Sequence, residues 1–124
     1  MESYEIGSGE SNVLFHVESE RGVLGAMLRS RDAAMLAFES LKASDFYDPT
    51  NREIFDAMQA LAATAKPLDL VTLDEELSRR GKLDAVGGSA YLARLIRSVP
   101  SVVNARAYIR IVDEKAMMRR LVAA

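Results

Sequence analysis

The sequence predicts an all-α fold, a compact bundle of about six helices, and three observations lead to this prediction. Hydrophobic residues make up 49% of the 124-residue chain, which suits one domain with one core. Several segments place apolar residues at helical spacing, and these segments carry helix start and stop signals. No segment alternates apolar and polar residues over a convincing length, and no internal repeat is visible.

The first helix is expected over residues 18–28, after a Ser-, Gly- and Glu-rich stretch, residues 1–13. That stretch is predicted to be a flexible tail, or in part residues left over from cloning. Glu18 and Glu20 suit the positive end of the helix dipole. Gly22 and Gly25 each weaken the helix by roughly 1 kcal/mol relative to alanine. Their expected benefit is the close approach of another helix.

A second helix is expected over residues 32–41, with Asp32 as its cap. Its inward-facing residues are predicted from the apolar spacing to be Ala34, Met35, Phe38 and Leu41. Residues 45–47 then form a short connector, and its aromatic residues, Phe46 and Tyr47, are predicted to fill part of the core.

The third helix has the strongest start signal, because a capping carboxylate, Asp48, precedes Pro49 at the first helical position. This helix is expected to run to about residue 64 and to end before Lys66 and Pro67. The residues it is predicted to bury are Ile54, Phe55, Met58 and Leu61.

A fourth helix is expected between residues 69 and 80. Thr72 and Glu75 have the spacing of a capping box, but the apolar residues place the helix start nearer Leu70. Gly81 can adopt the left-handed conformation that closes a helix. A turn over residues 82–88 leads into a fifth helix, which carries Tyr91 and is expected to stop before Pro100.

The last helix, from about residue 101 to the chain end, carries two apolar stripes. The first stripe comprises Val102, Ala105, Tyr108, Ile109, Val112 and Ala116. The second stripe comprises Ala107, Ile111, Met118 and Val122, and it lies roughly 100–140° around the helix at 100° per residue. One stripe can face the core of this domain, and the other needs a second surface, in another segment or another chain. Because the periodicity continues to the last residue, we expect a fragment cut inside a helix.

Composition excludes several classes of function. The chain has no cysteine and one histidine, so thiolate metal sites and histidine clusters are not expected. It has no run of about 20 apolar residues, so no membrane span is expected, and a reducing cytoplasm fits the lack of cysteine. Residues 1–88 carry 9 basic and 16 acidic side chains, whereas residues 89–124 carry 7 basic and 2 acidic ones. The basic end could meet phosphate, but we expect its arginines to solvate a helix or to pair with a partner's carboxylates.

No catalytic, cofactor-binding or metal-binding residues are predicted. His16 lies beside the tail and is expected to be a helix-start or surface residue. Asp74, Glu75 and Glu76 are adjacent on a helix, so they point in different directions and are expected to form a solvated face. Gly87 and Gly88 lack a preceding strand and a following Lys-Ser/Thr pair, so they are expected to form only a turn.

Four segments together resemble the amino-terminal domain of bacterial replicative DNA helicases of the DnaB type. The resemblance covers about residues 14–124. Residues 17–25, VESERGVLG, resemble the family's "I-E-A-E-x-x-V-L-G", and residues 45–58 resemble its "D-F-Y … H-x-x-I-F-x-A-M". Residues 69–92 resemble "D-x-V-T-L … L … G-x-L … V-G-G-x-x-Y-L", and residues 99–112 resemble "T-P-S-x-x-N-x-x-x-Y-x-x-I-V". No one segment is specific, but the four in this order and spacing are.

The departures from the family pattern are few and lie near the start of the first helix. Leu14 stands where proline is common, His16 where Ser or Asn is common, and Ser19 where Ala is common. A nucleotide-binding loop of the form G-x-x-x-x-G-K-[ST] is missing from this sequence. In the family that loop belongs to a separate motor domain, so ATP and Mg²⁺ are expected there and no cofactor is expected in this chain.

The resemblance implies a role in assembly rather than catalysis, within a parent chain that would be an ATP-dependent DNA helicase. Domains of this family pair through a helical hairpin, of which the last helix here would be the first arm, and the pairs form a trimer-of-dimers collar on a hexameric ring. The collar docks primase and in some bacteria other proteins, such as a helicase loader, and DNA is bound only through the intact hexamer. A stand-alone helical adaptor from a phage or plasmid, with the same fold and no motor, is the alternative.

The residues expected at partner interfaces come from two sources. The second stripe supplies Ala107, Ile111, Met118 and Val122 as the residues available for self-association. The resemblance adds Tyr91, because the matching family tyrosine lies near the surface that docks primase. Tyr91 has an alternative role, packing inward with Leu92 and Leu95, and the sequence does not decide between the two.

Overall fold

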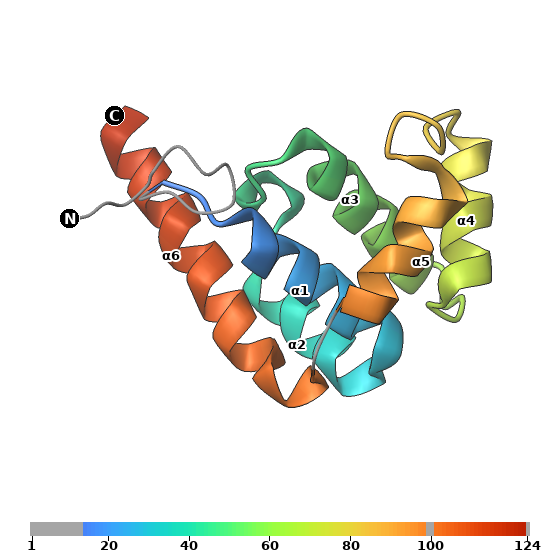
Figure 1. Cartoon of the computed structure of the whole chain (residues 1–124), viewed down its shortest axis with the longest axis horizontal. Helices are drawn as coiled ribbons and strands as arrows, with labels where there is room; N and C mark the ends of the chain where they lie inside the picture. The colour runs from blue at the N-terminus through green and yellow to red at the C-terminus, as the bar shows by residue number, and fades with distance from the viewer. Residues whose placement is uncertain (1–13, 99–100, 124) are drawn as a thin grey trace.

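The computed structural model describes residues 14–98 and 101–123, which form helices and no strand. The α-helices are α1 (Val17–Arg29), α2 (Arg31–Ser40), α3 (Pro49–Ala63), α4 (Leu70–Arg79), α5 (Gly88–Ser98) and α6 (Ala105–Ala123), and two 3₁₀ turns are η2 (Ala43–Asp45) and η3 (Val102–Asn104). The long helix α6 lies along one side of the molecule, and α4 and α5 lie on the other (Figure 1). The predicted all-α fold is confirmed, whereas the predicted tail, residues 1–13, lies outside the described residues.

Helix α1 is the centre of the bundle, because it packs against α2, α3, α5 and α6. Gly22 makes the contact with α6 possible. A Cβ atom at Gly22 would lie 2.8 Å from Cδ2 of Tyr108, closer than real Cβ atoms approach other atoms. The close helix approach predicted for the glycines of this segment is therefore confirmed at Gly22.

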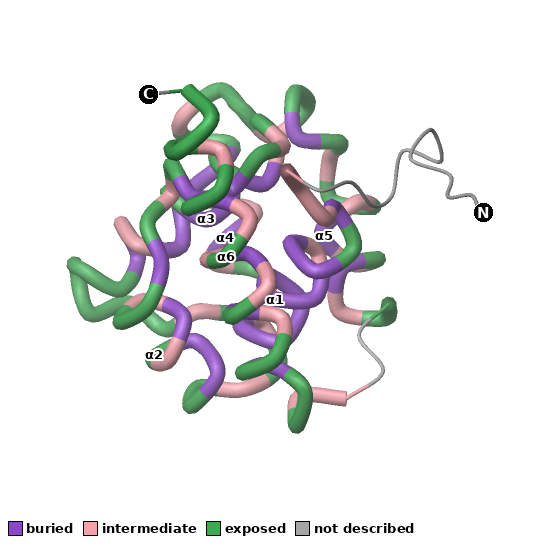
Figure 2. The backbone as a smooth tube through the Cα atoms, turned by 90° about the vertical axis from the view of Figure 1, so that its left-hand side faces the viewer, coloured by how far each residue is buried: buried purple, intermediate pink, exposed green. Residues whose placement is uncertain are grey.

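The core is built around the aromatic ring of Phe55 on α3. Phe38 of α2 and Phe46 of the connector pack against it, with ring centroids 5.7 Å and 4.9 Å away. The four residues predicted to be buried on α3 are all buried, and they are Ile54, Phe55, Met58 and Leu61. Along the helices, buried stretches alternate with exposed ones (Figure 2), as expected for helices that cover one shared core.

Local signals in the sequence placed most of the helix ends correctly. The Asp48 carboxylate accepts a hydrogen bond from the Thr50 backbone N–H at 2.8 Å, and Pro49 is the first residue of α3. Helix α4 begins at Leu70, where its cap is Asp69, which exchanges hydrogen bonds with Thr72. Gly81 has a φ of 71° and follows α4, as predicted.

Three predictions around α2 and the connector are wrong. The cap of α2 is Ser30 rather than Asp32, because Ser30 has an extended backbone and its hydroxyl accepts the Ala33 N–H at 3.2 Å. Met35 is 54% exposed, since α2 buries its small residues Ala33, Ala34 and Ala37 instead. Phe46 is fully buried as predicted, but Tyr47 is 44% exposed. Phe46 has an extended backbone, and consecutive side chains of extended chain point to opposite sides.

Within residues 14–98 and 101–123, no helix combines the length and the apolar character needed to cross a lipid bilayer.

Replacing Gly22 by alanine should destabilise the domain, because the added methyl group displaces the Tyr108 ring from α1. We expect a loss of about 1–3 kcal/mol in the free energy of unfolding, measured by chemical denaturation. The double variant Gly22→Ala/Tyr108→Ala should lose less than the sum of the two single variants, since removing the ring removes the clash. Strictly additive losses would show that the two residues do not clash.

Candidate protein-interaction surfaces

Helix α6 presents one apolar face to the bundle and leaves the other uncovered. Its buried residues are Ala105, Ile109, Val112 and Ala116, which all belong to the first predicted stripe. In the second stripe, Ala107, Met118 and Val122 are exposed and Ile111 is half-buried. Met117 and Leu121 add to the exposed apolar side chains near the end of this helix. The described part of the chain therefore leaves most of the second stripe uncovered.

Two arginines hold the end of α6 against the rest of the domain. Arg119 donates hydrogen bonds to the backbone carbonyls of Leu14 and Asp45, both at 2.7 Å. Arg120 forms an ion pair with the buried Asp45 carboxylate at 3.0 Å. The basic residues of this segment were expected to solvate a helix or to pair with carboxylates of another protein. That expectation is wrong for Arg119 and Arg120, because both bind groups of the same chain. Their contacts fix which side of α6 faces inward.

The exposed Tyr47 ring lies beside Arg119. It stacks on Phe15, with ring centroids 4.0 Å apart and ring planes only 6° from parallel. The Arg119 guanidinium carbon lies 5.6 Å from the Tyr47 ring centroid, within the range of a cation–π contact. Tyr47 thus joins the start of the domain to the end of α6 instead of filling the core.

A buried carboxylate, Glu20 in the first turn of α1, links this helix to the start of α3. Its Oε2 accepts the Tyr47 backbone N–H at 2.6 Å, and its Oε1 accepts the Asp48 N–H at 3.2 Å and the Asn51 side-chain amide at 3.1 Å. These donors surround the N-terminus of α3, where free N–H groups and the helix dipole favour a negative charge. Glu20 therefore stabilises the start of α3, in addition to lying in the first turns of its own helix.

Burial raises the pKa of Glu20, and the hydrogen bonds from Tyr47, Asn51 and Asp48 offset part of that rise. Sequence reasoning assigned Glu20 only to the dipole of its own helix and did not single out Asn51. Both residues are almost completely buried, yet their partners lie 27 to 40 positions away along the chain. Local spacing holds no signal for such a pairing.

Tyr91, the residue expected near a partner, is half-buried on α5. Its hydroxyl donates a hydrogen bond to Oδ1 of Asn51 at 3.0 Å, which links α5 to the Glu20 network. The guanidinium carbon of Arg94 lies 5.6 Å from the ring centroid. Burial raises the pKa of Tyr91, and a hydrogen bond with Arg21 partly opposes this rise. Inward packing is thus part of the role of Tyr91, and the rest of its ring remains accessible.

The acidic residues of α4 do not form a uniformly solvated face. Glu76 is buried and pairs with Arg79 at 2.7 Å and Arg80 at 2.9 Å, and these hydrogen bonds lower its pKa. Arg80 also pairs with Glu53 and Asp56 of α3. The prediction of a solvated face is wrong for Glu76, because α3 packs against α4 and brings Arg80 between them. Across the described ranges, no three His, Asp or Glu side chains are placed to hold a metal ion.

His16 acts at the start of α1, as the sequence predicted. Its Nδ1 accepts the Ser19 backbone N–H at 3.1 Å, so the imidazole replaces the small polar side chain that usually caps a helix. Gly87 and Gly88 have φ angles of 107° and 75° and form the turn into α5, also as predicted.

Comparison with known proteins agrees with this arrangement of helices and motifs. The family described as "DnaB-like helicase N terminal domain" matches residues 13–114 of the chain. The chain belongs to this family. The resemblance proposed from the four sequence segments is therefore confirmed.

Relatives of this chain include longer proteins named as replicative DNA helicases. The replicative DNA helicase DnaB of Mycobacterium leprae is 46% identical over 106 residues, which cover 86% of this chain and 18% of the relative. The replicative DNA helicase DnaC of Bacillus subtilis is 40% identical over 107 residues, which cover 86% of this chain and 24% of the relative. The chain thus spans about a fifth of the length of these relatives.

A solved structure in the family has the same fold. The crystal structure of the N-terminal domain of DnaB helicase from Mycobacterium tuberculosis superposes with a TM-score of 0.85 at 43% sequence identity. The match covers 90% of this chain and 81% of that one. The arrangement of the helices is therefore shared with an N-terminal DnaB domain.

Replacing Glu20 by glutamine should destabilise this family domain. The amide nitrogen of glutamine would face one of the N–H donors that now point at a carboxylate oxygen, leaving that donor unsatisfied. We expect a loss of about 1–3 kcal/mol in the free energy of unfolding, measured by urea denaturation. Glu18→Gln is the matched control, because Glu18 is exposed on the same helix and should change stability little. Equal losses in both variants would contradict the role assigned to Glu20.

Proposed function

We propose that this chain is the amino-terminal collar domain of a hexameric replicative DNA helicase. In this proposal the domain catalyses no reaction. It mediates dimerisation and ring assembly, as a trimer of dimers, and it presents a docking surface for primase and for a loader protein. DNA is then bound only by the intact hexamer. ATP and Mg²⁺ bind in a motor domain of the parent chain, to which this chain's residues contribute no nucleotide-binding loop.

The uncovered apolar stripe of α6 is the observation that carries the assembly role. Ala107, Met118 and Val122 line one side of this helix while Arg119 and Arg120 fasten it to the domain. A helix fixed in this way cannot turn its second stripe inward, so the stripe is available to a second chain. Contact between two such stripes would remove apolar surface from water, which favours pairing.

The primase-docking role is supported by the family resemblance at Tyr91 and by the position of this side chain. Its hydroxyl is held by Asn51, which is completely buried, so the ring has a fixed orientation at the surface. Aromatic residues with a fixed ring and a polar tip are frequent at the centres of protein interfaces.

Met118→Glu should disrupt self-association, because a charge would be buried in the paired stripes. The measurement is the sedimentation coefficient of the chain extended through the second hairpin arm that the family resemblance predicts. We expect the variant to sediment as a smaller species at concentrations where the unmodified protein is paired. Ile111→Glu should act in the same direction.

Val71→Glu is the control for these charge substitutions. Val71 is 76% exposed on α4, on the other side of the molecule from α6 (Figure 1), so its substitution should leave pairing intact. An unchanged sedimentation coefficient for Met118→Glu would contradict assembly through this stripe.

Tyr91→Ala should weaken primase binding by about tenfold or more, measured by isothermal titration calorimetry, if the ring is a central contact. The same change should also lower the melting temperature, since it removes the hydrogen bond to Asn51. Tyr91→Phe keeps the ring and loses only that hydrogen bond, so it should lower stability while preserving most of the binding.

Leu95→Ala is a control for stability alone, because Leu95 is buried on the same helix and cannot touch a partner. It should reduce the free energy of unfolding by about 2–5 kcal/mol and leave primase binding unchanged well below its melting temperature. If Tyr91→Ala also lost stability but not binding, Tyr91 would be a packing residue only.

The coding sequence downstream of Ala124 tests the parent protein. A second amphipathic arm, a linker and then a G-x-x-x-x-G-K-[ST] loop would agree with a helicase. A stop codon soon after Ala124 would instead favour the stand-alone adaptor.

A further inference from the structure

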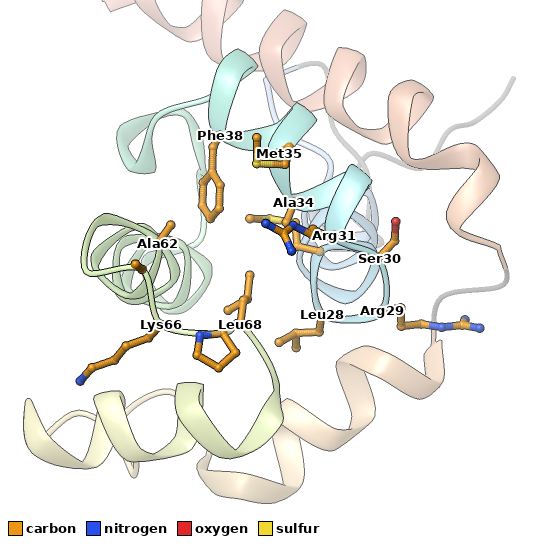
Figure 3. Close-up of a pocket in the computed structure, with 13 residues that line it drawn as sticks. Leu28, Arg29, Ser30, Arg31, Ala34, Met35, Phe38, Ala62, Lys66 and Leu68 are labelled. Atoms are coloured by element: carbon orange, nitrogen blue, oxygen red, sulfur yellow. The ribbon is translucent and has the colours of Figure 1, made fainter.

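A surface groove lies at the corner between α1 and α2, facing the segment that follows α3 (Figure 3). Its volume is about 640 Å³, within the range of sites that bind ligands or peptide side chains. Met35 and Phe38 of α2 form one side, and Leu28 and Leu68 form another. None of these residues belongs to the α6 stripe or to the Glu20 network.

The apolar residues that line the groove are partly exposed to water. Met35 is 54% exposed, and Leu28, Phe38 and Leu68 are half-buried. Among the uncharged lining residues only Ser30 has a polar side chain, and its hydroxyl already accepts the Ala33 N–H. The groove therefore has little with which to orient a small polar ligand, but it offers apolar surface to another protein segment.

Hydrogen bonds within this chain hold the backbone on two sides of the groove. At the end of α3, Ala65 takes a φ of 58°, and the Lys66 N–H donates to the Leu61 carbonyl at 3.0 Å. This closure turns the chain so that Leu68 returns to the groove. On the other side, the Ser30 cap sets where α2 begins. A preformed groove binds a partner with a smaller loss of conformational entropy.

The charged residues that line the groove are all basic. They are Arg29, Arg31 and Lys66, all exposed, and no carboxylate is among the thirteen lining residues. In the close-up, Arg29 and Lys66 extend outward at opposite ends of the groove (Figure 3). This positive border contrasts with the chain as a whole, which has a net charge of −2.

We propose that this groove binds an acidic amphipathic helix of a partner protein. Apolar side chains of that helix, spaced at three and four positions, would contact Met35, Phe38, Leu28 and Leu68. Asp or Glu residues beside them would lie near Arg31 and Lys66. Apolar contacts supply affinity, and the charges select acidic segments over basic ones.

The test uses the 124-residue chain and a synthetic helical peptide of about 15 residues, roughly four turns. The peptide carries Leu at helical spacing and Glu on both sides of the Leu stripe. A second peptide has Lys in place of every Glu. Amide shifts in ¹⁵N–¹H spectra give the affinity and the binding position. We expect micromolar binding of the Glu peptide, with the largest shifts around residues 28–38 and 66–68, and at least about tenfold weaker binding of the Lys peptide.

Two variants locate the interaction. Met35→Glu should weaken binding of the Glu peptide by about tenfold or more. The new carboxylate would place a negative charge among the apolar residues of the groove and would repel the Glu residues of the peptide. Met118→Glu is the matched control, because it makes the same change at a methionine of α6 that is 42% exposed, and it should leave the affinity unchanged. Arg31→Glu should also weaken binding, and the loss should shrink as salt is added. Each variant should give the circular dichroism spectrum of the unmodified chain, which checks that it is folded.

Three results would overturn the proposal. These are equal affinity for the Glu and Lys peptides, shifts centred on α6 instead of the groove, and an equal loss of affinity in Met35→Glu and Met118→Glu. A further result would assign the groove to a second copy of this chain instead. In that case the unmodified chain would sediment as a pair and bind no peptide, and Met35→Glu would sediment as a monomer. Met118→Glu tests collar assembly and Met35→Glu tests the groove, so failure of one proposal is distinguishable from failure of the other.

Discussion

The Glu20 carboxylate is the contact through which the central helix fixes its neighbours. Placed among three N–H donors at the start of α3, it binds α1 to α3, and through Asn51 and Tyr91 it reaches α5. A charge this deeply buried is stable only if its hydrogen bonds are satisfied, so the start of α3 can move little relative to α1. The apolar core around Phe55 then packs between helices whose relative positions are already constrained.

A second set of polar contacts fixes α6 on this frame. Arg119 and Arg120 reach Asp45 and the Leu14 carbonyl, while Tyr108 lies against Gly22 of α1. Because both ends of the helix are held, its rotation about its own axis is fixed. This fixed rotation buries the first stripe of α6 against the bundle and leaves most of the second stripe in water.

The α6 stripe and the groove between α1 and α2 differ in charge and in setting. The α6 stripe is a single helix face near the end of the chain, suited to packing against a similar helix. The α2 groove is a concave surface bordered by Arg29, Arg31 and Lys66, suited to a narrow acidic segment.

The sequence by itself determined where most helices begin and end, because caps, prolines and glycines act over a few residues. Asp48 with Pro49, the start at Leu70 and the stop at Gly81 are examples, and the two stripes of α6 follow from its periodicity. Tertiary structure alone decided the roles of Glu20, Tyr47 and Arg119, the burial of Glu76 and the exposure of Met35. The hydrogen-bond partners of Glu20 and Arg119 lie from 27 to 105 positions away along the chain, so helix packing, not local spacing, brings them together. Met35 has helical spacing with the core residues, but the direction from which α1 and α6 approach α2 leaves it in solvent.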